Sequence, residues 1–474
     1  MSSPIESLFD GQAGAVWRHF ADLASIPRPS KYEGPVRDHL AQRARANGWE
    51  HRQDAAGNVV FAVSGRGSLA DAPALVLQGH LDMVCEKNRD TAHDFMTDPI
   101  RLQLAGDWVT ADGTTLGADN GVAVALAMAV AEADMPNRMP LELLFTIDEE
   151  TGLNGALDLD PKIVHGKQLL NLDSEEDGVF TIGCAGGIDM NVCFAGDSAA
   201  ASREVVEISL RGLRGGHSGV NIHEGRANAI RILARIICEL RSDNAGVRLH
   251  QFVGGNKKNA IPREASAIIS GWNAESAERV AERVLGTIRD REPAIEISFV
   301  RDNRNVTELP ISLIDFLVAV PHGVMQMDAH FPDLVHTSNS IGVLHAVGAD
   351  VLVGMHGRSF ADSAKDALSE TCQSLALDAG ATFSSKGHYP GWEPTPDSDL
   401  RRRAVAVFAE VFGHAPRVEG IHAGLETGIL GKKLGISELL STGPTIENAH
   451  SPDERLLIES LNRNYAFLAA FVST

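Results

Sequence analysis

Leu77-Gln-Gly-His-Leu-Asp-Met-Val84 is the stretch around which the chain is organised. The apolar run from Ala74 to Leu77 predicts a short buried strand, and His80 and Asp82 follow it directly. In an open α/β sheet, functional sites collect where parallel strands end. A neutral imidazole is a good zinc ligand, and a carboxylate two residues away can orient it. A histidine at a strand end is more often structural, so the motif needs further ligands elsewhere in the chain.

Two more predicted strands end in carboxylates. The run Leu141–Ile147 is followed by Glu149 and Glu150, and the run Lys167–Leu172 is followed by Asp173. Paired glutamates usually lie on a solvated surface. These two follow a β-branched and aromatic run that is typical of an interior strand, which favours a functional interpretation.

Two further candidates lie outside these strands. Asp119 comes just before the alanine-rich segment Val122–Ala133, which is typical of a helix, and a carboxylate is favourable at a helix N-terminus. A plain helix cap explains Asp119 equally well at this point. His450 lies in a predicted loop before the last predicted helix, Leu456–Val472.

The joint set contains two histidines and several carboxylates, and it suits a pair of divalent ions with nitrogen and oxygen ligands. One carboxylate can bridge two metals about 3.5–4 Å apart, and a glutamate left over can accept a proton from water. The candidates are His80, Asp119, Glu149, Glu150, Asp173 and His450.

The order of predicted elements indicates an α/β catalytic domain with a mixed, mostly parallel sheet flanked by helices. The segment between residues 83 and 121 is expected to be rich in loops. Residues 205–300 predict a βαββαβ-like order, which forms a small sheet with two helices on one face. Residues 311–390 repeat this order of elements more weakly, which suggests an internal duplication as a further hypothesis. We expect catalytic pieces at 1–184 and 395–474, with an inserted α+β lid domain at 185–394.

Length and composition limit the function class. At 474 residues the chain exceeds one ordinary core, and its 44% hydrophobic content fits a soluble globular protein. No apolar run reaches the roughly 18 residues that a membrane span needs, and the N-terminus does not resemble a signal peptide. We therefore expect a cytoplasmic protein with no membrane partner.

Charge and cysteine content point the same way. The net charge of −21 argues against nucleic acid as a partner. The plain interpretation is a solvated acidic surface, although bound divalent cations could neutralise part of it. Five cysteines without a Cys-x-x-Cys pair indicate reduced thiols rather than disulfides or a thiolate zinc site.

Taken together, six motifs resemble the aminoacylhistidine dipeptidases (the peptidase D family). That family belongs to the dizinc superfamily that also contains carboxypeptidase G, aminoacylase and carnosinase. The resemblance spans nearly the whole chain, with the motifs in the order that is typical of the family. They are Gly79-His-Leu-Asp82, Gly117-Ala-Asp-Asn-Gly121, Asp148-Glu-Glu-Thr-Gly152, Asn171-Leu-Asp173, Gly215-Gly-His-Ser-Gly219 and Ala449-His-Ser-Pro-Asp-Glu454.

The resemblance implies a role for each metal-site residue. One metal would be bound by His80, Asp119 and Asp173, and the other by Asp119, Glu150 and His450, with Asp119 as the bridge. Asp82 would orient His80. Glu149 would act as general base, accepting a proton from a water that the metals acidify and delivering it to the departing amine. Asp173 stands where some branches carry glutamate, and the aspartate favours dipeptidase over carboxypeptidase activity.

The resemblance also implies residues that bind the substrate. His217 would stabilise the negative charge that develops on the carbonyl oxygen, although a histidine in a glycine-rich loop can also be a plain turn residue. Arg358 would clamp the terminal carboxylate, and Asn259 would assist. Glu426 could bind the free amine, but a structural role explains its loop, His422–Gly428, equally well. A duplicated insert could present His217 within its own chain.

The expected function is hydrolysis of dipeptides with a free amino group, including Xaa-His and β-alanyl-histidine types. The alternatives are an N-acyl amino acid deacylase, a carboxypeptidase of the same superfamily, and a non-catalytic metal- or peptide-binding protein. The expected cofactors are two divalent ions per chain, with zinc first and cobalt or manganese as alternatives. The expected partner is a small peptide substrate, and a homodimer remains open.

Overall fold

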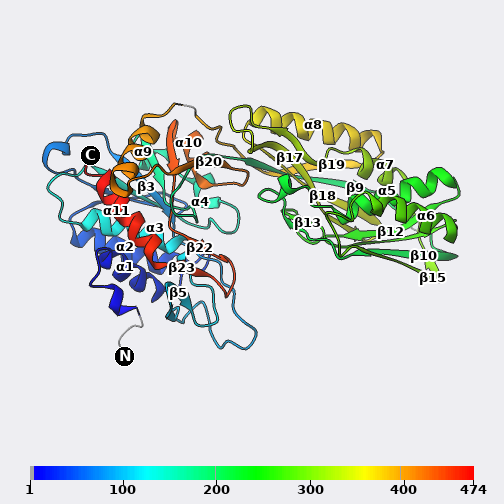
Figure 1. The fold of residues 1–474 in the computed structure, drawn as a ribbon, viewed down its shortest axis with the longest axis horizontal. Helices are drawn as coiled ribbons and strands as arrows, with labels where there is room; N and C mark the ends of the chain where they lie inside the picture. Colours follow the sequence, from blue (N-terminus) through cyan, green and yellow to red (C-terminus); the bar gives the residue numbers. More distant parts are fainter. Residues whose placement is uncertain (1–4, 198, 396) are drawn as a thin grey trace. The chain divides into compact units, whose positions relative to one another are not determined.

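The computed structural model describes residues 5–197, 199–395 and 397–474 (Figure 1). The chain divides into two compact units. Unit 1 comprises the described residues of Met1–Cys184, Trp392–Gly420 and Leu425–Thr474, and unit 2 comprises Ala185–Gly391 and Ile421–Gly424. The short second segment of unit 2 is held there because the Ala185 N–H donates to the carbonyl oxygens of Ile421 and Ala423.

Unit 1 is built on an eight-stranded sheet. Its strands lie in the order β1 (Glu50–Gln53), β2 (Val59–Val63), β6 (Leu141–Thr146), β3 (Leu75–His80), β7 (Gln168–Asn171), β21 (Glu438–Ser441), β8 (Val179–Cys184) and β20 (Arg417–Ile421). The four central strands β6, β3, β7 and β21 are parallel, whereas β1, β2 and β8 pair antiparallel. Every residue of β3 and β6 is buried, which explains why these strands are continuous apolar runs rather than alternating ones.

Helices from both ends of the chain cover this sheet, and Figure 1 shows the orange and red C-terminal helices among the blue and cyan N-terminal elements. They are α1 (Gly14–Ala24), α2 (Gly34–Ala46), α3 (Ala118–Glu132), α4 (Asn154–Asp158), α9 (Asp399–Phe412), α10 (Glu426–Leu434) and α11 (Ile458–Phe471). Helix α3 packs against β3, α1 and α11 and is buried almost all round, which accounts for its alanine-rich sequence. Gly79 of β3 is needed there, because a Cβ would lie 2.5 Å from the Ala123 Cβ.

A second, four-stranded sheet in unit 1 corrects the expectation of a loop-rich segment before Gly121. Its strands lie in the order β22 (Ile446–Glu447), β23 (Arg455–Leu457), β5 (Trp108–Ala111) and β4 (Leu102–Ala105). These strands are only two to four residues long, so they carry too little alternation to be recognised in the sequence. The sheet fixes both ends of the loop that contains His450.

Unit 2 is built on a nine-stranded sheet. The main path is β15 (Glu296–Val306), β10 (Ala201–Arg211), β14 (Ala265–Ser270), β12 (Arg248–Gly254), β17 (Val335–Val347), β18 (Asp350–Ser359), β9 (Gly186–Phe194) and β19 (Thr382–Tyr389), with β16 (Gly323–Met327) paired to β17. Two short strands, β11 (Gly216–His217) and β13 (Ala260–Ile261), form a separate pair. The helices are α5 (Ala229–Asp243), α6 (Ala274–Gly286), α7 (Ser312–Ala319) and α8 (Asp362–Asp378).

The topology of unit 2 is duplicated. The first repeat runs β10, α5, β12, β14, α6, β15, and the second runs β9, α7, β17, β18, α8, β19. When the four strands of each repeat are numbered along the chain, both repeats place them side by side in the order 4-1-3-2. The second strands of the two repeats, β12 and β17, pair where Gly254 meets Leu344. The first repeat is inserted into the second after its opening strand β9, which the sequence did not predict.

The helices of unit 2 pack on one face of this sheet and form its hydrophobic core. Gly357 of β18 faces α8, because a Cβ there would lie 3.0 Å from Leu368. The neighbouring residues His356 and Arg358 therefore lie on the opposite face. No helix in the described ranges is long and apolar enough to cross a membrane.

Candidate active site

Three central strands of unit 1 deliver polar residues to one edge of the sheet. His80 is the last residue of β3, Glu149 and Glu150 follow β6, and Asp173 follows β7. Because these strands are parallel, their carboxyl ends meet at the same edge. The structure thus brings these four predicted residues together.

Asp119 lies between two histidines. Its Oδ1 is 3.1 Å from His80 Nε2, and its Oδ2 is 3.0 Å from His450 Nε2. Asp119 has non-helical backbone angles within the first turn of α3, so its side chain departs from the helical path. Each oxygen of one carboxylate therefore faces a different histidine, which is the arrangement of a bridging ligand.

The remaining carboxylates fall into two groups around this bridge. Asp173 Oδ1 lies 3.6 Å from His80 Nε2, and Glu149 Oε2 lies 4.0 Å from the same nitrogen. Glu150 Oε2 lies 3.0 Å from His450 Nε2. His450 has a φ of 63°, a left-handed conformation that costs a non-glycine residue about 1 kcal/mol and is often found at functional sites.

The geometry of these residues fits metal ions. The ligand atoms of His80, Asp119 and Glu150 all lie within 4.8 Å of one another. Ligands at about 2.0–2.1 Å around a tetrahedral ion are separated by about 3.3 Å, which is close to the 3.0–3.6 Å separations found here. Glu150 Oε1 is also buried without a hydrogen-bond partner, so it has an unused ligand atom.

The electrostatics of the cluster also favour bound cations. Burial alone would lower the pKa of His80, but Asp173 and Asp119 raise it well above its ordinary value. Hydrogen bonds with Asp119 and Glu150 raise the pKa of His450 to about 11. Burial and neighbouring carboxylates raise the pKa of Asp173. The carboxylates outnumber the histidines, and this excess of negative charge is what divalent ions would neutralise.

Asp82 connects two parts of the cluster. Its Oδ1 lies 3.3 Å from His80 Nδ1 and accepts the Glu149 N–H, while its Oδ2 accepts the Glu150 N–H and the Ser30 hydroxyl. Burial disfavours its charge, but hydrogen bonding with His80 and the other donors holds its pKa at about 2. The structure therefore places Asp82 where it orients the His80 ring and also fixes the Glu149–Glu150 segment.

Two supporting residues were missed by the sequence reasoning. The buried Glu454 carboxylate accepts four main-chain N–H groups, from residues 116 to 119, at 2.7–3.2 Å. The buried Arg28 donates to the carbonyl oxygens of Leu81, Asp82 and Gly117. Glu454 stands in the same motif as His450, but nothing in the local sequence reveals partners more than 330 positions away.

Glu426 is the first residue of helix α10, not part of a loop as expected. Its side chain is fully buried, and its Oε2 accepts hydrogen bonds from Gln78 and Thr146 at 2.6 and 2.7 Å. Its Oε1 has no partner. Burial raises its pKa to about 7, so a cationic group beside it would be stabilised.

The remaining predicted residues lie in unit 2. The N–H groups of Gly219 and Val220 donate to His217 Nδ1 at 3.3 and 3.0 Å, so the proton of the neutral ring resides on Nε2. Burial and the charge of Arg358 lower the pKa of His217 to about 4. His217 is therefore a neutral imidazole with an Nε2–H donor near pH 7.

Arg358 and His217 face each other as two donors. Arg358 Nη2 lies 3.4 Å from His217 Nε2, and Nη1 lies 3.3 Å from the Tyr389 hydroxyl. Arg358 is only 4% exposed, and the described residues give it no ion pair with a carboxylate, so its charge suits it to bind an anion. The Asn259 side chain is exposed, and its carbonyl oxygen accepts the Ser218 N–H beside His217.

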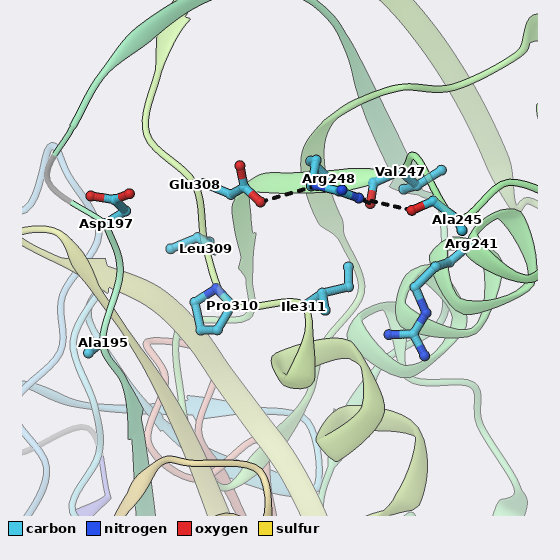
Figure 2. A pocket seen from close by; sticks show the side chains of 10 residues that line it. All are labelled: Ala195, Asp197, Arg241, Ala245, Val247, Arg248, Glu308, Leu309, Pro310 and Ile311. Carbon is cyan, nitrogen blue, oxygen red and sulfur yellow. Dashed lines mark hydrogen bonds and ion pairs between the residues drawn. The ribbon is translucent and has the colours of Figure 1, made fainter.

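A pocket of about 380 Å³ in unit 2 contains none of the predicted residues. Figure 2 shows its lining side chains, with Arg248 directed toward Glu308 and the Ala245 carbonyl oxygen. The other lining arginine, Arg241, is paired with Asp315. Since both arginines are neutralised by the protein itself, this pocket does not compete with Arg358 as an anion site.

Comparison with known proteins shows the family of the chain. Residues 76–474 match the model of "Peptidase family M20/M25/M40". The cytosol non-specific dipeptidase of Escherichia coli (strain K12) is 36% identical over 96% of both chains. The crystal structure of aminoacylhistidine dipeptidase from Vibrio alginolyticus matches with a TM-score of 0.88 and 35% identity over 98% of both chains. Aminopeptidase PepT from Bacillus cereus, at 16% identity and a TM-score of 0.58 over 98% of both chains, shares the fold.

Proposed function

Because the chain belongs to peptidase family M20/M25/M40, we propose that it is a metal-dependent dipeptidase acting on dipeptides with a free amino group. The observation that carries this proposal is the Asp119 carboxylate, whose two oxygens face His80 and His450 separately. Two relatives that are over a third identical are a non-specific dipeptidase and an aminoacylhistidine dipeptidase. The proposed substrates therefore include Xaa-His and β-alanyl-histidine dipeptides.

We assign two divalent ions to the two groups of ligands. His80 and Asp173 would hold one ion and Glu150 and His450 the other, with Asp119 shared between them. Zinc fits these nitrogen and oxygen donors, as do cobalt and manganese. When bound, such ions polarise the peptide carbonyl and make water acidic near neutral pH.

Glu149 is the proposed general base. Its main-chain N–H donates a hydrogen bond to Asp82, which fixes the backbone from which the Glu149 side chain extends. Burial and the neighbouring charges of Glu426 and Glu150 raise the pKa of Glu149 well above its ordinary value, so the carboxylate binds a proton readily. It accepts the proton of the attacking water and delivers it to the departing amine nitrogen.

The substrate is held by groups of complementary charge. Arg358 is assigned the terminal carboxylate, which its fork of N–H groups can bind with two hydrogen bonds, and Asn259 assists. Glu426, with its unpartnered Oε1, is assigned the free ammonium group. The Nε2–H of His217 is assigned the oxygen that becomes negative as the carbonyl is attacked.

We place the enzyme in the cytoplasm and propose that a single chain is catalytically complete, with a homodimer as the alternative assembly. The five cysteines are unpaired, as is usual in a reducing compartment, and the relative from E. coli is named a cytosol enzyme. Unit 2 has a duplicated sheet, and a duplicated insert could present His217 within its own chain. This supports catalysis by one chain. Activity in a sample shown to be monomeric by light scattering tests it, and an inactive monomer would contradict it.

Glu149→Ala provides the sharpest test of the mechanism. We expect dipeptide hydrolysis to fall by about 10²–10⁴-fold, while the metal content measured by elemental analysis stays at two ions per chain. The exposed Glu176→Ala variant is the control and should retain activity. Wild-type activity in Glu149→Ala would remove Glu149 from the mechanism.

A paired substrate assay tests the reaction class. The wild-type enzyme should hydrolyse a dipeptide with a free amino group and leave its N-acetylated form intact. A preference for the acetylated form would instead identify a deacylase.

A further inference from the structure

A row of polar side chains lies beside Arg358 on the same face of the unit 2 sheet. Strands β17 and β18 place Ser340 opposite His356 and Ser338 opposite Arg358. On the other side of β18, strand β9 places Asp189 opposite His356. Residues opposite one another in neighbouring strands share a face, so Ser340, His356 and Asp189 form one row. We call this the His356 row.

His356 is held firmly at one edge of its ring. Its Nδ1 lies 2.7 Å from Asp189 Oδ1, and Asp189 Oδ2 accepts a hydrogen bond from Lys258 Nζ at 3.0 Å. The Lys258 side chain lies over Gly354, where a Cβ would come within 3.2 Å of Lys258 Cε. An ionised carboxylate can only accept hydrogen bonds, so the neutral His356 ring carries its proton on Nδ1, facing Asp189.

The other ring nitrogen is left as an unused acceptor. His356 is 8% exposed, and its Nε2 is buried with no hydrogen-bond partner among the described residues. Burial lowers the pKa of His356 despite the contact with Asp189, so the ring is neutral and Nε2 keeps its lone pair. The Ser340 hydroxyl, opposite His356, is likewise buried and unpartnered. Unpaired buried polar atoms are costly, and at such a density they indicate a polar ligand.

The His356 row lies close to Arg358, the proposed receptor for the carboxylate of the substrate. His356 and Arg358 are two residues apart on one strand and therefore about 7 Å apart. An amino acid residue whose carboxylate is bound by Arg358 can span that distance with a side chain of three or four bonds. Only a side chain with a hydrogen-bond donor at its end would satisfy His356 Nε2.

We propose that His356 and Ser340 form a specificity subsite that accepts a hydrogen bond from an N–H or O–H group on the side chain of the substrate's second residue. This inference rests on the proposed function, because it takes Arg358 as the carboxylate receptor. It narrows the substrate class to dipeptides whose second side chain ends in a donor. An isosteric side chain without a donor would leave the acceptor unpaired and is therefore disfavoured.

Binding to the Glu149→Ala variant tests the subsite separately from catalysis. Isothermal titration calorimetry with the metal-loaded full-length variant should show that Ala-Gln binds about tenfold or more tightly than Ala-Met, which has a similar shape but no donor. Adding His356→Phe should bring the two dissociation constants within about twofold of each other. Ser340→Ala removes a single oxygen atom and should reduce the ratio without disturbing packing.

The control is His345→Phe, the same substitution at an exposed position of β17, and it should keep the full ratio. Equal binding of the two dipeptides in the Glu149→Ala background, or a ratio that survives both His356→Phe and Ser340→Ala, would overturn the subsite. Failure of the wild-type enzyme to hydrolyse any dipeptide would instead overturn the proposed function, and the binding ratio would still decide the subsite.

Discussion

The two ring nitrogens of His217 have different surroundings, and this difference determines what the residue can do. Two main-chain N–H groups bind Nδ1, which leaves Nε2–H as a donor. The pKa of about 4 keeps the ring neutral above about pH 5. In its proposed role, His217 would donate to a developing negative charge without changing its own protonation near neutral pH.

We expect His217→Ala to lower kcat by about 10²–10³-fold, the usual effect of removing a donor to a developing oxyanion. The metal content should not change, because His217 is not a ligand in this scheme. Steady-state kinetics with elemental analysis provides the measurement, and the exposed His223→Ala variant is the matched control. A large rise in KM with unchanged kcat would show that His217 binds the ground state instead.

At the residue scale, the proposed ligands could be identified in the sequence where they follow a strand. His80, Glu150 and Asp173 each come after an apolar run, and the carboxyl ends of parallel strands meet. Glu454 and Arg28 could not be predicted, because their partners are main-chain atoms brought close only by the fold. His356 gives no signal either, since alternation along a strand does not reveal an unpaired nitrogen.

At the element scale, the start of α3 depends on a residue from another part of the chain. Glu454 accepts the N–H groups of residues 116–119. Residues 117–119 are the cap and first residues of α3, whose N–H groups have no partner within the helix. Gly117, at the helix cap, has a φ of 69°, which a glycine adopts without strain. The position of Asp119 is therefore set by the loop that also carries His450.

Glu454→Gln tests this coupling. An amide has one acceptor oxygen and no charge, so it cannot hold four N–H groups as the carboxylate does. We expect metal affinity, measured by competition with a chelator, to fall by about 10–100-fold. The exposed Glu459→Gln variant should bind metal like the wild type. Unchanged metal affinity in Glu454→Gln would show that Glu454 caps the helix without affecting the metal site.

The other end of α3 is held by an ion-pair network. Glu132 accepts hydrogen bonds from Arg43 of α2 at 2.6 and 2.9 Å and lies 3.1 Å from His19 of α1. Burial disfavours its charge, but the bonds with Arg43 and His19 lower its pKa to about 2, from an ordinary 4.5. The folded state therefore binds this proton more weakly than the unfolded state does.

The contribution of Glu132 to stability should be fully present above about pH 4.5 and should be lost as the pH falls toward 2. Allowing for solvent screening, we expect Glu132→Gln to cost about 1 kcal/mol at pH 7, with a smaller difference at pH 3. Urea unfolding of the wild type and of Glu132→Gln at both pH values measures this difference in the free energy of unfolding. Glu50→Gln, at an exposed ion pair, should have no such effect, and a difference independent of pH would contradict the assignment.

Elements could be predicted where their pattern was long. The strand over Leu141–Ile147 and the helices over Val122–Ala133 and Leu456–Val472 were confirmed within a few residues. The short strands β4 and β5 were not recognised, and β12 and β19 show no clear alternation of apolar and polar residues. The regular alternation from Ile188 to Phe194 in β9 was overlooked. The glycine-rich stretch around Glu426 was expected to be a loop, but its buried residues form the start of α10.

At the scale of the whole molecule, every proposed metal ligand belongs to unit 1. Ions that bind only the folded state stabilise it, by about 2.7 kcal/mol at a hundredfold excess over Kd. Removing metal with a chelator should therefore destabilise unit 1 and leave the core of unit 2 unaffected. Hydrogen exchange followed by mass spectrometry distinguishes the two units. Equal loss of protection in both would show that they do not unfold independently.

Strand β21 lies between β7 and β8, although it is synthesised after all of unit 2. During translation, β7 and β8 therefore leave the ribosome without the strand that joins them. At about 5–20 residues per second, they wait for tens of seconds with unpaired edges. Such unpaired edges favour aggregation until β21 is made, and a chain that ends before Ser441 has neither a complete sheet nor His450.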